Sequence, residues 1–276
     1  MNPIKAAVSC RLVGLLFLLT QSHFHGVLAA ESRSPAFEMA HLGNSDSLQG
    51  HLDTFYDASL SMQIDQVLGT AVFKPVGDSS NPPPTGPFAL WVRFALTNSS
   101  PETVSRNLIY GTRLCDSVAA FYPNGSGGYI EYNAGEDSDL LDRQVPLALP
   151  VFEITVPAKQ ERVYYLRLYD GSSPSVKFTL MDWPELENSE TRRDLINGLF
   201  MGTLLLLLMY GIYLAAGSEW NQMYLWFLAY VVGVLLNTAF YHWGGAGIYL
   251  PAEIRGELNN RLIVVSAVIV FWAAER

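Results

Sequence analysis

The sequence predicts an all-β, jelly-roll-like antiparallel sandwich followed by α-helical transmembrane segments. Between residues 51 and 184, short runs rich in β-branched and aromatic residues alternate with turn residues, which is the pattern of a sandwich. From Leu195 onward the chain consists mainly of apolar runs, of which the first two are long enough to cross a bilayer as helices.

Turn and breaker residues separate the expected strands. Residues 124–128 read Asn-Gly-Ser-Gly-Gly, which predicts a hairpin turn, and residues 78–87 hold four prolines that cannot donate ladder hydrogen bonds. Residues 88–96 are apolar at neighbouring positions, which indicates a central strand buried on both faces, and Ser61–Leu68 is expected to be a short helix. The expected strands are His51–Tyr56, Phe88–Asn98, Val104–Tyr110, Leu114–Tyr122, Tyr129–Tyr132, Val151–Val156, Val163–Tyr169 and Val176–Met181.

The first 30 residues have the pattern of a secretory signal peptide. Lys5 and Arg11 precede a short apolar core, and small residues follow at Ala29 and Ala30. Residues 31–50 are polar and lack a periodic pattern, so we expect a flexible entry segment. Removal of the signal leaves Cys115 as a single cysteine, so the exported domain, at residues 51–184, has no internal disulfide.

The apolar part of the chain is divided by polar residues into three segments. We expect transmembrane helix 1 at 195–216 and transmembrane helix 2 at 220–242, with a juxtamembrane junction at 185–194. An extracytoplasmic loop at 243–258 and a partial transmembrane helix 3 at 259–276 follow. Because this third apolar run is shorter than a span, we expect the chain to be a truncated receptor.

Charge and composition argue against several classes of function. Residues 31–194 hold 22 acidic and 12 basic side chains, and an acidic surface repels nucleic acid. Apart from His23 and His25 in the expected signal peptide, the histidines are His41, His51 and His242, and they are not spaced as metal ligands. Since no catalytic motif occurs either, we expect no enzymatic activity, no metal and no cofactor.

Aromatic and charged residues of the expected strands are candidates for a ligand site, because sugar-binding sandwiches stack aromatic rings on sugars and fix hydroxyl or carboxylate groups with charged side chains. Four of the candidates are arginines, which bind carboxylates in a bidentate way. The alternatives are a core tryptophan and cross-strand pairing of the arginines. The candidates are Trp91, Arg93, Tyr110, Arg113, Asp116, Arg143, Tyr164 and Arg167.

Two glycines in the first apolar segment predict close helix packing. Gly198 and Gly202 stand four residues apart and form a small-residue face that allows another helix to approach. The expected partner is the second or the third span.

Several stretches resemble the bacterial seven-transmembrane receptors with diverse intracellular signalling modules. Residues 52–180 resemble their second type of extracellular domain in the Leu90-Trp91-Val92-Arg93-Phe94 strand, in the 135–143 segment, and in the strands that hold Phe152-Glu153-Ile154 and Tyr165-Leu166-Arg167-Leu168. The Asn197–Gly202 and Tyr210–Tyr213 stretches, followed by Tyr224, Leu225 and Tyr230, are similar to the start of their seven-helix region.

The resemblance implies a periplasmic, carbohydrate-binding-like domain that senses a small ligand and signals through helices to an output module, which this chain lacks. We expect a multi-pass protein of the bacterial inner membrane with its N-terminal domain in the periplasm. The expected partners are the lipid bilayer, a small carbohydrate or carboxylate ligand, and either a second copy or a separate signalling protein. The alternative is an envelope docking module that senses no small molecule.

Overall fold

The computed structural model describes residues 33–40, 43–112, 115–171, 174–217 and 222–243, together with residues 261, 264, 265, 268 and 272. The expected signal peptide lies outside the described residues. Most of the expected extracytoplasmic loop and of the third apolar segment also lies outside them.

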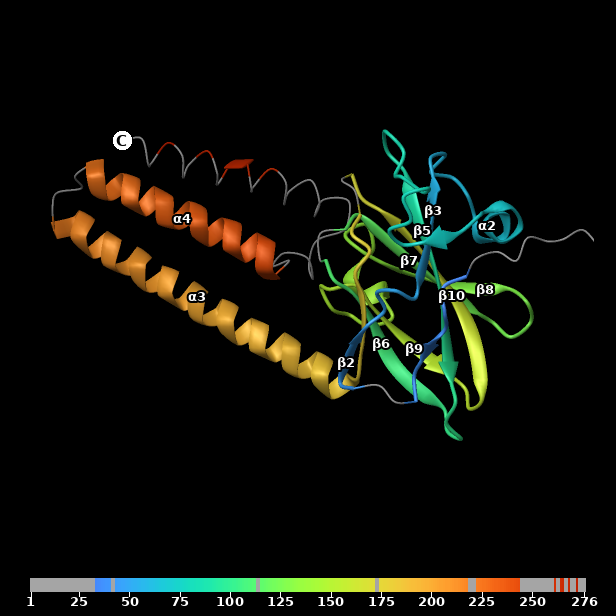
Figure 1. Cartoon of the computed structure of the whole chain (residues 1–276). Helices are drawn as coiled ribbons and strands as arrows, with labels where there is room; N and C mark the ends of the chain where they lie inside the picture. Colours follow the sequence, from blue (N-terminus) through green and yellow to red (C-terminus); the bar gives the residue numbers. More distant parts are fainter. Residues whose placement is uncertain are drawn as a thin grey trace, which may run out of the picture. The chain divides into compact units, whose positions relative to one another are not determined.

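Two β-sheets form a sandwich (Figure 1). Within the described residues, the first sheet has the order β4-β3-β5-β10-β7-β8, and the second has the order β2-β11-β6-β9. Every pairing is antiparallel except that of β1 with β5. The predicted antiparallel sandwich is confirmed, while its jelly-roll connectivity stays a prediction. The strands are β1 Phe37–Glu38, β2 Ser45–Ser47, β3 Leu52–Asp57, β4 Lys74–Pro75, β5 Ala89–Asn98, β6 Val104–Tyr110, β7 Ser117–Pro123, β8 Tyr129–Ala134, β9 Val151–Val156, β10 Gln160–Tyr169 and β11 Phe178–Met181.

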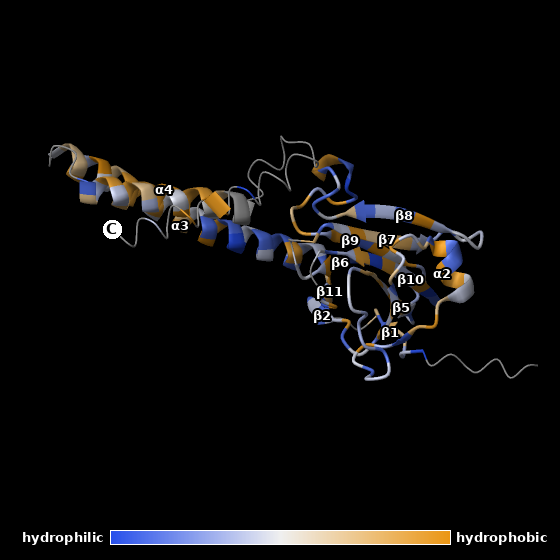
Figure 2. Ribbon diagram, turned by 90° about the horizontal axis from the view of Figure 1, so that it is seen from above, coloured by the Kyte–Doolittle hydropathy of each residue, from blue (hydrophilic) through white to orange (hydrophobic). Residues whose placement is uncertain are grey.

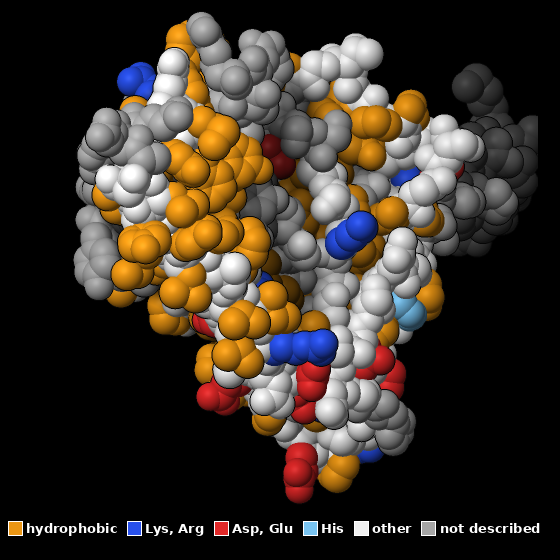
Figure 3. Space-filling view, turned by 90° about the vertical axis from the view of Figure 1, so that its left-hand side faces the viewer, with side chains coloured by type: hydrophobic (Ala, Val, Ile, Leu, Met, Phe, Trp, Pro, Cys, Tyr) orange, Lys and Arg blue, Asp and Glu red, His pale blue; other side chains and the backbone are white. Residues whose placement is uncertain are grey.

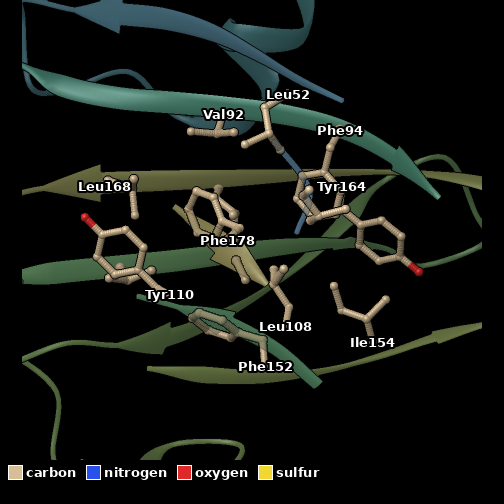
Figure 4. Packing of buried hydrophobic residues seen from close by; sticks show 14 of the residues in the cluster. Leu52, Val92, Phe94, Leu108, Tyr110, Phe152, Ile154, Tyr164, Leu168 and Phe178 are labelled. Carbon is tan, nitrogen blue, oxygen red and sulfur yellow. The ribbon is translucent and has the colours of Figure 1, made fainter. Parts of the chain in front are cut away.

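The core lies between the two sheets (Figure 4). Val92, Phe94 and Leu168 come from the first sheet, and Leu108 and Phe152 come from the second. All of them are almost completely buried. Because successive side chains of a strand point to opposite faces, alternate positions of each strand supply this layer.

Strand β5 is the central strand that the sequence predicts. It pairs with β3 on one side and β10 on the other, and almost every residue from Ala89 to Asn98 is buried. Its second face is covered by α2 (Ile64–Thr70), since Val67 packs with Phe73 and Trp91 in a separate apolar cluster. The expected short helix is therefore present, shifted by two or three residues toward the C-terminus.

The expected flexible entry segment, residues 31–50, contributes two strands over its described part. Strand β1 pairs with Leu96 and Thr97 of β5, past Phe94, where the pairing of β5 with β3 ends. Strand β2 forms the edge of the second sheet beside β11. Met39 and Leu48 are fully buried in the main core. The absence of a periodic pattern is misleading here, because these strands are two and three residues long and are held by their neighbours.

The chain passes from β11 to α3 through a single residue, Asp182. Helix α3 extends over Trp183–Gly217, so the expected juxtamembrane junction is helical. Asp182 caps the helix by accepting a hydrogen bond from the Glu185 N–H at 3.0 Å through its side chain and one from the Leu186 N–H at 3.1 Å through its backbone. Such caps satisfy amides that have no partner inside the helix.

Among the described residues, α3 is the one helix that is long and apolar enough to cross a membrane. Figure 2 shows hydrophilic residues in its first turns and mainly hydrophobic residues beyond them. Many of these apolar side chains are exposed, including Leu195, Leu199 and Leu206, and Figure 3 shows hydrophobic side chains gathered over a broad area of the surface. A second helix, α4 (Gln222–Trp243), packs beside α3.

Candidate ligand-binding site

A hollow of about 350 Å³ lies where the edges of the two sheets come together. Strands β7, β8 and β10 supply it from the first sheet, and β9, the edge strand of the second sheet, supplies it from the other side. The segment after the 3-10 helix η1 (Leu140–Asp142) contributes one further side chain. The lining residues are Tyr122, Pro123, Tyr132, Gln144, Glu153, Thr155, Arg162 and Tyr164.

Three tyrosine rings meet at this hollow. The ring centroid of Tyr122 lies 4.9 Å from that of Tyr132 and 5.5 Å, edge to face, from that of Tyr164. These distances are typical of favourable aromatic pairs. Tyr164 also stacks on Phe94 in the core, as Figure 4 shows, and its hydroxyl donates to the Thr155 carbonyl at 3.2 Å. The rings are thus anchored in the sandwich on one side and border the hollow on the other.

Gln144 links Tyr122 of the hollow to β9, the edge strand of the second sheet. Its Nε2 donates to the Glu153 carbonyl at 3.2 Å, while its Oε1 accepts from the Glu153 N–H at 3.0 Å and from the Tyr122 hydroxyl at 3.2 Å. The amide side chain therefore binds both backbone groups that Glu153 presents at the open edge of β9. The Glu153 side chain itself is exposed.

The charges and hydroxyls of the site are suited to a polar ligand. Burial, followed by the nearby Tyr164, Tyr132 and Glu153, raises the pKa of Tyr122, so its hydroxyl stays neutral. Burial likewise raises the pKa of Tyr164 to about 12, although the charge of Arg162 acts in the opposite direction. Arg162 is half-buried and shares the Tyr164 face of β10 because the two residues are two positions apart.

Of the expected site residues, Tyr164 lines the hollow and the others that the structure describes do not. Trp91 is fully buried beneath α2, where its ring stacks on Phe121 with centroids 5.2 Å apart. Tyr110 lies in the main core with its ring centroid 5.2 Å from that of Phe178. Arg113 lies outside the described residues.

Arg93 forms a buried ion pair on the same covered face of the first sheet. Its Nη2 and Nε lie 3.0 Å and 3.3 Å from Oδ2 of Asp53, the residue paired with it on β3. Its guanidinium carbon lies 4.6 Å from the centroid of the Phe73 ring. Asp53 also accepts hydrogen bonds from Ser34, of which the shortest, from Oγ, is 2.7 Å. These contacts give Arg93 a structural role.

Arg167 binds a turn at the side of the same face. Its Nη2 donates to the Leu60 carbonyl at 2.7 Å, and Leu60 has a positive φ of 61°. The neighbouring Asp57 accepts hydrogen bonds from Ser59 and from the Met62 N–H. Burial alone would raise the pKa of Asp57, but these hydrogen bonds, with the charge of Arg167, hold it below its ordinary value.

Arg143 and Asp116 bind backbone groups. The Arg143 guanidinium donates to the carbonyls of Leu147, at 2.9 Å, and of Ala148, Ser138 and Gly135. Asp116 accepts from the Gly171 N–H at 2.9 Å. Among the candidates that the structure describes, Tyr164 alone lines the hollow, and the role of the others in ligand binding stays a prediction.

Sequence reasoning missed most of the hollow: Tyr122, Tyr132, Gln144, Glu153, Thr155 and Arg162 were not among the candidates. Alternation along β10 is a signal that could have found Arg162, because it shares a face with Tyr164. Gln144 and Glu153 carry no such signal, since their closeness depends on how the two sheet edges meet.

The contact between α3 and α4 involves Gly211. A Cβ atom there would come within 2.9 Å of both the Leu228 and the Phe227 side chains, so this glycine permits the close approach. At Gly198 and Gly202 a Cβ atom would meet nothing within 4 Å in the described part of the chain. Their packing role stays a prediction.

Comparison with known proteins finds a family model that matches most of the sandwich. Residues 49–182 match the family model described as 7TMR-DISM extracellular 2. The match begins just before β3 and ends at Asp182, directly before α3. A search of curated proteins finds no match.

Proposed function

Because residues 49–182 of this chain belong to the 7TMR-DISM extracellular 2 family, we propose that the protein is the sensor part of a membrane-bound signal-transduction receptor. The sandwich binds a small ligand at the hollow and is coupled to α3 and α4, which lie in the bacterial inner membrane. The sandwich faces the periplasm after export by residues 1–30. The output module belongs to a further segment or to another protein.

The membrane location is supported by the length and exposure of α3. Its 35 residues extend about 52 Å at 1.5 Å per residue, and the hydrocarbon core of a bilayer is about 30 Å thick. The polar first turns, up to Asp194, then lie outside the hydrocarbon. Exposed leucines beyond them would be unfavourable in water and are suited to lipid.

The side chains that line the hollow are suited to a ligand with a hydroxylated ring and a carboxylate, such as a sugar acid. The half-buried rings of Tyr122 and Tyr132 offer apolar surface for the ring of the sugar, the buried Tyr164 ring supports them from the core, and Arg162 offers a cation for the carboxylate. The Glu153 carboxylate accepts hydrogen bonds from hydroxyls, and the Gln144 amide can both accept and donate them. The single observation that carries the proposal is this meeting of tyrosines with Arg162 in one hollow.

Binding of D-glucuronate by the full chain in detergent micelles, measured by calorimetry, tests the proposal. The expected result is saturable binding that Arg162→Gln weakens at least about tenfold, since a charge-assisted hydrogen bond contributes about 1.5–3 kcal/mol. D-glucose, which lacks the carboxylate, should bind equally to both forms.

Lys177→Gln is the matched control, because it removes the same charge from an exposed position that does not line the hollow. The absence of binding by D-glucuronate and D-galacturonate alike would contradict the ligand proposal. So would an equal effect of the control. Crosslinking in membranes that recovers one protein partner without added ligand would favour the docking alternative.

A further inference from the structure

The segment Arg143–Leu149, named the coupling segment here, joins the hollow to the beginning of α3. Its second residue, Gln144, lines the hollow and binds both the Tyr122 hydroxyl and the backbone of Glu153. After Gln144, Val145 belongs to an apolar cluster that contains Leu186 of α3, and Leu147 and Leu149 pack against that cluster. One short stretch therefore contacts both the proposed ligand site and the transmembrane helix.

The contact with the helix is an apolar cluster separate from the main core. Leu186, in the first turn of α3, is 1% exposed and shares this cluster with Val145, Ile109 and Val151. Leu147 and Leu149 of the coupling segment pack against the same cluster. Leu186 thus packs the first turn of α3 against the sandwich, beside the covalent connection through Asp182.

Arg143 ties the two ends of the coupling segment together. Its guanidinium donates to the carbonyls of Leu147 and Ala148 within the segment and to those of Gly135 and Ser138 before it. These hydrogen bonds brace the segment against local bending and hold it to the residues before it.

We infer that the coupling segment carries a change in the occupancy of the hollow to α3, an inference that rests on the proposed function. A ligand that binds the Gln144 amide competes with Glu153 for the same donor and acceptor. Loss of the Gln144–Glu153 pairing releases the segment from β9, shifts Val145, and alters the support of Leu186. The ligand can shift α3 only to the extent that it binds the released arrangement of the segment more tightly than the paired one.

Hydrogen exchange of the full chain in lipid nanodiscs, without any ligand, tests this coupling. Gln144→Ala should speed exchange of the amides of residues 186–190 on the order of tenfold, because it removes hydrogen bonds that hold their support in place. Thr155→Ala is the matched control, since Thr155 also lines the hollow but lies on β9 and not on the coupling segment. It should leave these amides unchanged.

Coupling is reciprocal, which provides a second variant. Leu186→Ala should speed exchange of the Glu153 amide, whose hydrogen bond is accepted by Gln144. Leu186→Met keeps the side-chain volume and should leave that amide close to the wild-type rate.

Equal exchange at residues 186–190 in Gln144→Ala and Thr155→Ala would overturn the inference. An effect of Leu186→Ala confined to α3 would overturn it as well. These measurements use no ligand, so they are separate from the binding test. If D-glucuronate binds but Gln144→Ala leaves exchange at residues 186–190 unchanged, the ligand site stands and this coupling route is wrong. If Gln144→Ala alters exchange but D-glucuronate does not bind, the coupling route stands and the proposed ligand is wrong.

Discussion

Replacing Arg93 by methionine should destabilise the sandwich by about 3–5 kcal/mol, because it leaves a buried carboxylate without its cation. Asp53 is 1% exposed and Arg93 is 6% exposed, so water cannot replace the lost partner. Methionine retains much of the apolar side chain beside Phe73, so the loss arises mainly from the two hydrogen bonds to Asp53. Ser34 still donates to the carboxylate, which prevents a larger loss.

The assay is urea-induced unfolding of the full chain in detergent micelles, followed by near-ultraviolet circular dichroism. Arg33→Met is the matched control, because Arg33 pairs with Glu161 at 3.1 Å on the surface with both side chains more than a third exposed. Exposed pairs of this kind contribute about 0–1 kcal/mol.

A double variant isolates the pair from the other effects of each change. Asp53→Asn combined with Arg93→Met removes both charges and keeps an acceptor for Ser34. We expect it to cost less than the sum of the single variants, with a coupling of about 2–3 kcal/mol. A loss below about 1 kcal/mol in Arg93→Met, equal to that in Arg33→Met, would refute the reasoning and return Arg93 to the list of ligand-binding candidates.

Three further changes test other contacts. Asp57→Asn should lower the free energy of unfolding at pH 7 by about 1–2 kcal/mol. Because the pKa of Asp57 is lower in the folded protein than in the unfolded chain, this contribution is lost as the pH falls through the folded-state pKa, and the melting temperatures of the two proteins should converge in acid. A difference in melting temperature that stays constant with pH would contradict this. Gly211→Leu should weaken the α3–α4 contact by about 1–3 kcal/mol, measured by unfolding in sodium dodecyl sulfate, and Gly198→Leu should leave this contact unchanged. Equal effects of the two changes would contradict the close approach of α4 at Gly211. Asn98→Ala should lower the free energy of thermal unfolding by about 2–3 kcal/mol, because the buried side-chain amide of Asn98 donates to three carbonyls. The exposed Ser99→Ala is the control, and an equal loss in the two variants would contradict this role of Asn98.

The sequence predicts strands well where side chains alone decide them. Strands β6 and β9 begin and end at the expected residues, and β5 was expected one residue longer at its start. Strands β1, β2 and β4 were missed because they have two or three residues and exist only through their neighbours. Strand β10 begins three residues earlier than expected, since the polar stretch Gln160–Arg162 continues the pairing with β5 as far as Asn98.

The site was harder to predict than the fold for a physical reason. Trp91 and Arg93 stand on the face of β5 that α2 and Phe73 cover, and the sequence does not indicate which face a helix will cover. The hollow, in turn, needs the edges of two sheets to meet, so it depends on contacts between residues far apart in the chain, such as Tyr122 and Gln144. Alternation indicates which residues share a face, but it does not indicate which faces meet.

Labelling of a cysteine placed at Leu141 measures most directly whether the sandwich is an exported domain held in the membrane. This side chain is 80% exposed, whereas the native Cys115 is buried and burial raises its pKa to about 12, so Cys115 stays unreactive. We predict that Leu141→Cys reacts with a membrane-impermeant maleimide in cells whose inner membrane is intact, and that the labelled protein resists an alkaline carbonate wash. Reaction only after the inner membrane is broken, or release of the protein by the wash, would contradict the account.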